Sequence, residues 1–208
     1  MTTHPSEREL AALRRRDPVL GRFMKTCEPF PRMPQPSHAR LTHYEVLARS
    51  IVHQQLSGKA AATIWSRCTA LGGGRFPNAK HLKDFSDEAL RSAGLSRPKL
   101  RALRSLADAV NSGAVRLRTL GRLEDEQILD ELVQLHGIGR WTAQMLLIFK
   151  LGRLDVLPDQ DLGIQEGLRR LDELDERPTP AELVERAAVW SPLRSVASWY
   201  LWRLADQA

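Results

Sequence analysis

The feature that most constrains how this chain can fold is a pair of glycines, Gly137 and Gly139, set between two apolar helical patterns. The first pattern has apolar residues at helical spacing: Ile128, Leu129, Leu132 and Leu135. The second pattern runs from Arg140 to about Leu151. The sequence therefore predicts two helices joined by a tight turn, in which backbone can come close to a partner. The start of the second helix would present unpaired N–H groups beside Arg140, an arrangement that suits a phosphate.

A second motif lies downstream of this turn, and a third lies upstream. The downstream motif reads Leu157-Pro158-Asp159-Gln160-Asp161-Leu162-Gly163-Ile164, and the upstream motif reads Gln54-Gln55-Leu56-Ser57. The turn itself reads Leu135-His136-Gly137-Ile138-Gly139-Arg140-Trp141-Thr142-Ala143, and Gly139 and Asp161 are separated by 161 − 139 = 22 positions. In residues, order and spacing, the three motifs resemble those of the helix-hairpin-helix (HhH-GPD) DNA glycosylase superfamily. Within it the chain is most similar to the alkyl-adenine branch, that of 3-methyladenine DNA glycosylase II. The match covers roughly residues 40 to 208.

The resemblance implies an all-α fold of two helical lobes with the active-site cleft between them. The sequence has no stretch of alternating polar and apolar residues long enough to predict a β-strand, which agrees with an all-α fold. We expect residues 1–36 to form an N-terminal helix, from Ser6 to Phe23, and a proline-rich connector. Residues 37–208 would form the glycosylase core, with a central lobe over about 45–155 and a second lobe made of the N-terminal helix and about 156–208. Larger members of the branch carry an N-terminal β-domain, for which we expect no room here.

The composition is that of a folded, basic protein. Of 208 residues, 42% are hydrophobic and 27% are charged, which is typical of a globular chain. The net charge of +6 favours a polyanionic partner, although many proteins that never touch nucleic acid are mildly basic. No apolar run reaches the roughly 18 residues that a membrane span needs, and the first residues lack a signal-peptide core. We expect a cytoplasmic, bacterial protein that acts at the nucleoid and has no membrane contact.

The resemblance assigns the catalytic role to Asp161. In the family the catalytic aspartate stands three residues before an apolar position of the next helix, and Ile164 fits that step for Asp161 but not for Asp159. Breaking an N-glycosidic bond builds positive charge on the sugar, which a fixed carboxylate stabilises. An aspartate before a helix also commonly serves as an N-cap, and the two roles are compatible.

Aromatic and apolar residues near these motifs are expected to hold the extruded base. The resemblance places Trp141 and Trp202 at the base pocket, where the faces of their rings would attract a cationic base. Met145 and Leu162 would complete an apolar wall, and either could instead be core. Gln55 would reach the target base or its pairing partner.

Leu56 is expected to act as the DNA wedge. A predicted helix from about His38 to His53 ends before Gln54, and Ser57 can cap the next helix, from Gly58 to Leu71. The family places its wedging residue at this junction, where an apolar side chain fills the gap that an extruded base leaves in the stack. The alternative is that Leu56 belongs to the core.

The glycine turn is expected to grip the DNA backbone through Gly137, Gly139, Arg140 and Thr142. Related hairpins hold a monovalent cation with backbone carbonyls, and by position these carbonyls belong to Val133, Leu135 and Ile138. Many family members have a proline where this chain has His136, so the turn would be less preset.

No further cofactor is expected. Some relatives carry an iron–sulfur cluster after the catalytic helix, whereas this chain has only Cys27 and Cys68. The histidines show no metal-ligand spacing. Trp141 stands where strand-cleaving relatives carry a Schiff-base lysine, so the resemblance implies an enzyme that releases the base and leaves an abasic site.

The predicted function is a monofunctional glycosylase, acting as a monomer on double-stranded DNA, that flips out alkylated purines such as 3-methyladenine in base excision repair. Two alternatives were weighed. A non-catalytic DNA-binding module would have no need of Asp161 at this distance. A glycosylase for another damaged base is disfavoured by Trp141 and by the missing cluster.

The sequence alone does not decide the roles of two groups of arginines and of one aromatic cluster. Arg14-Arg15-Arg16 could lie against DNA or on a solvated helix face, and the same holds for Arg97, Arg101 and Arg104 at i, i+4 and i+7. At least two aromatic residues must be core among Trp190, Trp199, Tyr200 and Trp202.

Overall fold

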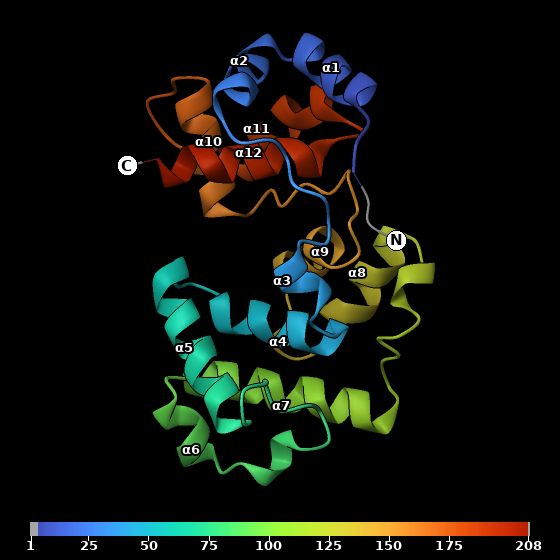
Figure 1. Cartoon of the computed structure of the whole chain (residues 1–208), viewed down its shortest axis with the longest axis vertical. Helices are drawn as coiled ribbons and strands as arrows, with labels where there is room; N and C mark the ends of the chain where they lie inside the picture. Colours follow the sequence, from blue (N-terminus) through green and yellow to red (C-terminus); the bar gives the residue numbers. More distant parts are fainter. Residues whose placement is uncertain (1–3, 208) are drawn as a thin grey trace. The chain divides into compact units, whose positions relative to one another are not determined.

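The computed structural model describes residues 4–207, and in this range the chain forms α-helices and short 3-10 helices without a β-strand (Figure 1). The predicted all-α class is confirmed. The chain divides into two compact units, residues 1–35 with 147–208, and residues 36–146; the sequence interpretation placed the later division near residue 155. None of the described helices is long and apolar enough to cross a bilayer.

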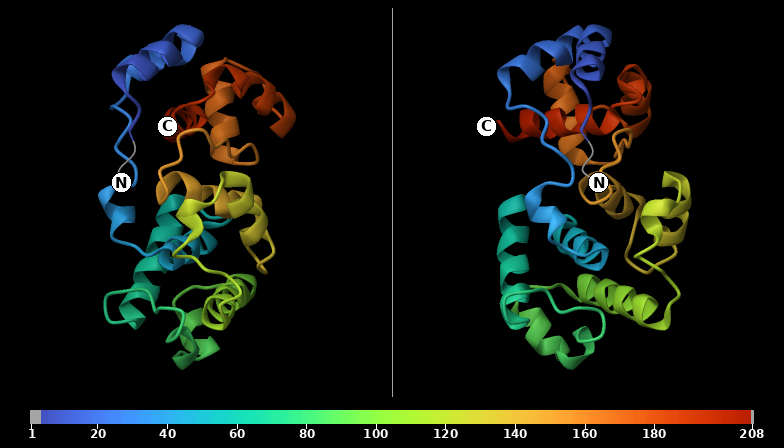
Figure 2. Two further views of the ribbon diagram at one scale, coloured as in Figure 1. Left: turned by 90° about the vertical axis from the view of Figure 1, so that its right-hand side faces the viewer. Right: turned by 45° about the vertical axis from the view of Figure 1, so that its right-hand side comes forward.

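The first unit, residues 1–35 with 147–208, is built on α10 (Leu162–Leu171) and α12 (Arg194–Asp206), which pack side by side (Figures 1 and 2). The two helices approach closely at Gly167, because a Cβ there would lie 2.2 Å from the carbonyl oxygen of Leu201. Their neighbours in the core are α1 (Glu7–Arg16), α2 (Pro18–Thr26), α11 (Pro180–Arg186) and η3 (Ala187–Trp190).

The helix predicted from Ser6 to Phe23 is in fact two helices, α1 and α2, and the break lies at Asp17-Pro18. Proline suits the first position of a helix but cannot continue one. Asp17 caps α2 by accepting a hydrogen bond from the N–H of Leu20 at 3.0 Å. The prediction was wrong here because the apolar spacing continues across the break.

The second unit, residues 36–146, is organised around α4 (His43–His53), which packs on α5 (Gly58–Leu71) and α7 (Arg97–Ser112). Ser57 caps α5 as predicted. The helix predicted from His38 is divided into α3 and α4, because Thr42 caps α4 in a capping box with Glu45. The other elements are α3 (Pro36–Ala39), η1 (Leu82–Asp84), α6 (Asp87–Ser92), η2 (Leu120–Arg122) and α8 (Asp125–Val133).

The helix α9 (Arg140–Phe149) carries the chain from the second unit into the first. Residues 134–139, between α8 and α9, are called the hairpin below. The predicted pair of helices around the two glycines is therefore present.

Candidate functional site

The Asp161 carboxylate is fixed at the start of α10. Its Oδ1 accepts a hydrogen bond from the backbone N–H of Ile164 at 2.9 Å, which makes Asp161 the N-cap of this helix. The same oxygen accepts a hydrogen bond from the indole Nε1 of Trp202, also at 2.9 Å. Asp159 differs, since its recorded hydrogen bonds in the described chain are those of its backbone, with Leu157 and Gln165.

The loop that carries Asp161 is anchored at a second point on α12. The Asp155 carboxylate accepts hydrogen bonds from Nε and Nη2 of Arg194 at 2.8 and 2.9 Å. Burial raises the pKa of Asp155, but hydrogen bonds from Arg194 and Ser191 outweigh it and hold the pKa below its ordinary value. The loop from Asp155 to Asp161 is thus tied to the start of α12 and, through Trp202, to its later turns.

Trp202 links Asp161 to an aromatic neighbour. Its ring stacks on Phe149 with centroids 5.5 Å apart and planes 28° from parallel, while its N–H points to the carboxylate. Gly163 leaves the room for this contact, because a Cβ there would lie 3.0 Å from both Asp161 Oδ1 and Trp202 Cδ1. Trp202 is partly buried, whereas the other three aromatic residues of the cluster are core: Trp190, Trp199 and Tyr200.

A pocket of about 400 Å³ opens beside Trp202 within the first unit. Phe149, Trp199 and Trp202 contribute aromatic walls, and Glu28 and Asp206 contribute carboxylates. Arg203 lines the same pocket, where it pairs with Glu28 at 3.6 Å and with Asp206 at 3.3 Å and lies over the ring of Trp199. Both carboxylates and this aromatic face are therefore already engaged by a cation of the chain itself.

The two apolar residues expected at the base pocket differ in exposure. Leu162, directly after Asp161, is 64% exposed and is therefore not core. Met145 of α9 is only 5% exposed. An exposed leucine next to a fixed carboxylate offers an apolar surface to a ligand at that point, whereas Met145 has little surface to offer.

The two glycines of the hairpin have different surroundings. Gly137 has φ +79°, and a Cβ there would lie 2.3 Å from the Cβ of Ala102 on α7, so a side chain is excluded. At Gly139 a Cβ would meet nothing within 4 Å. The backbone at Gly139 is therefore open to a partner.

Three consecutive residues at the start of α9 have different surroundings. Arg140 makes a two-pronged ion pair with Glu126 of α8, the shortest contact being 3.0 Å, and both side chains are largely exposed. Trp141 is partly buried. Thr142, expected to contact the DNA backbone, is 1% exposed, and its hydroxyl accepts a hydrogen bond from Gln54 at 2.9 Å. Its side chain thus supports the hairpin from inside.

The junction of α4 and α5 is a β-turn, residues 53–56, that presents Gln55 and Leu56. The N–H of Leu56 donates to the carbonyl of His53 at 3.3 Å. Gln54 has φ −49° and ψ 130°, and Gln55 has φ +54°, as in a type II turn. Leu56 is 40% exposed, which excludes the alternative that it is core.

Sequence reasoning missed three residues that shape these sites. Gln54 bonds to the hairpin, Gly163 makes room for Trp202, and Phe149 stacks on it. The motif Gln54-Gln55-Leu56-Ser57 drew attention to Gln54, but no periodicity predicts a contact 83 positions away.

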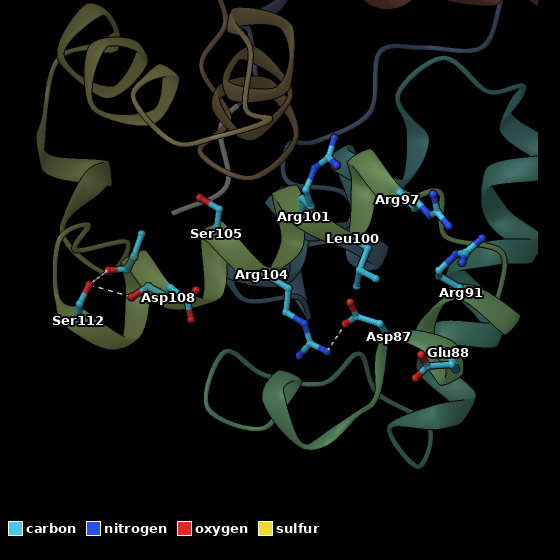
Figure 3. Close-up of a pocket in the computed structure, with 11 residues that line it drawn as sticks. Asp87, Glu88, Arg91, Arg97, Leu100, Arg101, Arg104, Ser105, Asp108 and Ser112 are labelled. Carbon is cyan, nitrogen blue, oxygen red and sulfur yellow. Dashed lines mark hydrogen bonds and ion pairs between the residues drawn. The ribbon is translucent and has the colours of Figure 1, made fainter.

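The arginines of α7 line a separate pocket of about 890 Å³ in the second unit (Figure 3). Arg104 is engaged, since it donates to the carbonyls of Leu82 and Phe85 at 2.6 Å each and pairs with Asp87 at 2.9 Å. Arg97 and Arg101 are exposed. Arg104 therefore stabilises the fold. Of the three arginines, only Arg97 and Arg101 have side chains available for a DNA contact.

Metal-ligating side chains do not gather anywhere in residues 4–207: no three His, Cys, Asp or Glu residues lie together as a metal site would need. The backbone carbonyls of Val133, at the end of α8, and of Leu135 and Ile138, in the hairpin, would be metal ligands of another kind. The carbonyl of Leu135 accepts the turn hydrogen bond from the N–H of Ile138 at 3.0 Å. Neutral oxygens of this type fit a hard monovalent cation better than a transition metal.

The fold and the site together define a class of all-helical proteins in which a carboxylate is fixed at the start of a helix. The model of the HhH-GPD superfamily of base excision DNA repair proteins matches residues 48–192. DNA-3-methyladenine glycosylase 1 of Schizosaccharomyces pombe is 38% identical over 177 residues, which cover 84% of this chain and 78% of that protein. The chain belongs to the HhH-GPD superfamily.

Two solved structures of similar proteins agree with this family assignment. The 3-methyladenine DNA glycosylase of S. pombe in complex with abasic DNA superposes with a TM-score of 0.89 at 35% identity, covering 94% of this chain and 95% of that one. A DNA-3-methyladenine glycosidase from Bacillus halodurans superposes with a TM-score of 0.79 at 33% identity, covering 100% of this chain and 93% of that one.

Proposed function

We propose that the chain is a monofunctional DNA glycosylase that extrudes alkylated purines such as 3-methyladenine from double-stranded DNA and hydrolyses their N-glycosidic bond in base excision repair. The names of its relatives and its family support this activity. The observation that carries the proposal is the Asp161 carboxylate, fixed by Ile164 and Trp202 beside the exposed Leu162.

The reaction asks for one well-placed negative charge. As the bond from C1′ to the base nitrogen breaks, its electron pair leaves with the base and positive charge grows on the sugar. Asp161 stabilises that charge, and a water oxygen then bonds to C1′ and gives up a proton. A purine alkylated at N3 or N7 already carries a positive charge in DNA and departs as a neutral base, so no general acid is required.

The base pocket in this proposal combines Trp202, Trp141, Met145, Leu162 and Gln55. Trp202 would have two tasks, because its N–H donates to Asp161 while its ring, stacked on Phe149, lines the pocket. The ring of Trp141 would stack on the base, and Trp141 in place of a lysine keeps the enzyme from forming a Schiff base with the sugar.

The second unit would supply the DNA grip. Leu56 fills the gap in the base stack, and the open backbone at Gly137 and Gly139 donates N–H groups to a phosphate beside Arg140. Thr142 contributes through its backbone and through support of the hairpin. The carbonyls of Val133, Leu135 and Ile138 would hold a monovalent cation, which supplies positive charge beside that phosphate. The enzyme would act as a monomer and needs no other cofactor.

The test is base release from methylated DNA. The wild-type protein should release 3-methyladenine and leave abasic sites without strand cleavage. Asp161→Asn should keep its fold and its affinity for DNA but lose about a hundredfold or more in excision rate, the scale of one preorganised charged group. Asp159→Asn is the matched control and should stay close to wild type. Release of base by Asp161→Asn at the wild-type rate would overturn the assignment.

A further inference from the structure

The β-turn of residues 53–56 is held to the hairpin by one side chain. Gln54 Nε2 donates to the carbonyl of Gly137 at 3.0 Å and to the hydroxyl of Thr142 at 2.9 Å. The first partner is in the hairpin and the second is one turn into α9, so one amide spans both sides of the glycine turn. The bond to Thr142 is partly buried, whereas the bond to Gly137 is exposed. The bond to Thr142 therefore stabilises more than a surface contact does.

The turn needs such support because of its backbone. Gln55 has φ +54°. A side chain in this left-handed region is strained, and glycine or asparagine is the usual residue there. A strained conformation persists only where its surroundings over-determine it. Gln54, the residue directly before Gln55, supplies that constraint from the hairpin.

Two further contacts make the assembly rigid. Lys99 of α7 donates from Nζ to the carbonyl of Val52, in the last turn of α4, at 2.7 Å. The hairpin in turn rests on α7, where Gly137 lies against Ala102. The end of α4, the hairpin and the first half of α7 therefore contact one another pairwise, and Gln54 makes the hydrogen bonds between α4 and the hairpin.

We propose that Gln54 is a positioning residue that fixes the turn carrying Gln55 and Leu56 to the phosphate-binding hairpin, so that both engage a damaged duplex in one register. The inference rests on the proposed function. It assigns Gln54 no contact with the base or the sugar. Its expected effect is on the selectivity for lesions, because the turn engages only an opened base stack, whereas the hairpin grips the phosphates of either duplex. The hairpin is also held without Gln54, by the packing of Gly137 on Ala102.

The experiment measures the affinity of the 208-residue chain for a duplex with a tetrahydrofuran abasic site and for the same duplex undamaged. Gln54→Ala should lower the ratio of these affinities by about tenfold, as expected for two lost hydrogen bonds, and leave the affinity for undamaged DNA almost unchanged. Thr142→Val removes one of the two bonds and should lower the ratio about threefold. Thr142→Ser keeps the hydroxyl, so the ratio of affinities should stay at the wild-type value.

Asn111→Ala is the matched control. Its Nδ2 donates to the carbonyl of Ala79 at 2.8 Å, so the substitution also removes a long-range amide bond in the second unit, away from the turn. It should lower the melting temperature to a similar extent without changing the ratio. The inference is overturned if Gln54→Ala changes the ratio no more than Asn111→Ala does, or if it weakens binding to both duplexes equally. Failure of the wild type to release any alkylated base would instead refute the proposed function, whatever the binding ratios.

Discussion

At the scale of single residues, the carboxylate of Asp161 has a fixed direction, which the proposed reaction requires. The N–H of Ile164 holds it from its own helix, and the indole of Trp202 holds it from α12. Because both donors reach the same oxygen, Oδ1, they fix the plane and direction of the carboxyl group. Preorganisation of this kind avoids reorientation as charge develops on the sugar.

The role of Trp202 can be separated from stacking by one substitution. Trp202→Phe keeps a ring against Phe149 but loses the N–H that Asp161 accepts. We expect the single-turnover excision rate to fall by about tenfold, with little change in the affinity for substrate, because the loss falls on the transition state. A weaker affinity with an unchanged rate would mean that Trp202 acts through base stacking alone.

The position of Asp161 could be predicted from the sequence, and the role of Trp202 only in part. An N-cap is a local feature, visible in the three-residue step to Ile164. The hydrogen bond from Trp202 spans 41 positions and depends on how closely α10 and α12 pack at Gly163, which no periodicity encodes. The hydrogen bond from Gln54 to Thr142 was missed for the same reason, because it joins residues 88 positions apart.

At the scale of the elements, Arg140, the first residue of α9 after the hairpin, forms an exposed ion pair with Glu126 of α8. Arg140 and Glu126 are 48% and 71% exposed in their side chains, and such a pair is weak enough to exchange for a phosphate. Glu126 nevertheless competes with DNA for the guanidinium. Its carboxylate also adds negative charge beside the proposed phosphate site.

Removal of this competitor should strengthen the grip. Glu126→Gln should raise the affinity for undamaged duplex about threefold and steepen the salt dependence by up to about one phosphate contact, because Arg140 becomes available. Glu131→Gln, elsewhere on α8, makes the same change in net charge and is the control. An equal gain in both variants would indicate a general charge effect and no special role for the pair.

The elements themselves were predicted well where local signals mark both ends. Ser57 and Gly72 bound α5, and each is a capping residue that can be identified in the sequence. The splits at Asp17 and Thr42 were missed because the apolar spacing continues through them. Capping geometry, and not hydrophobic periodicity, divides those helices.

At the scale of the whole molecule, the first unit is held by a buried ion pair that joins its two chain segments. Asp17 is 3% exposed, and its carboxylate accepts a hydrogen bond from Trp190 at 2.7 Å and pairs with Arg186 at 2.8 Å. Burial raises the pKa of Asp17, but the hydrogen bonds from Trp190, Leu20 and Arg186 more than offset it, so that the pKa lies below its ordinary value. The fold class was predictable from the motifs, but this link between residues 173 positions apart was not.

The last prediction follows from the sign of that shift. A carboxyl group with a lowered pKa in the folded state stabilises the fold above its unfolded pKa, near 3.9, and loses that contribution as the pH falls through the folded value. Asp17→Asn can still cap α2, but its amide cannot pair with Arg186, so the free energy of unfolding at pH 7 should fall by about 2–4 kcal/mol. In urea unfolding, the difference between wild type and variant should shrink steadily below pH 4. A difference that stayed constant from pH 7 to pH 2 would show that Asp17 stabilises the unit by shape and neutral hydrogen bonds, and that its charge contributes nothing.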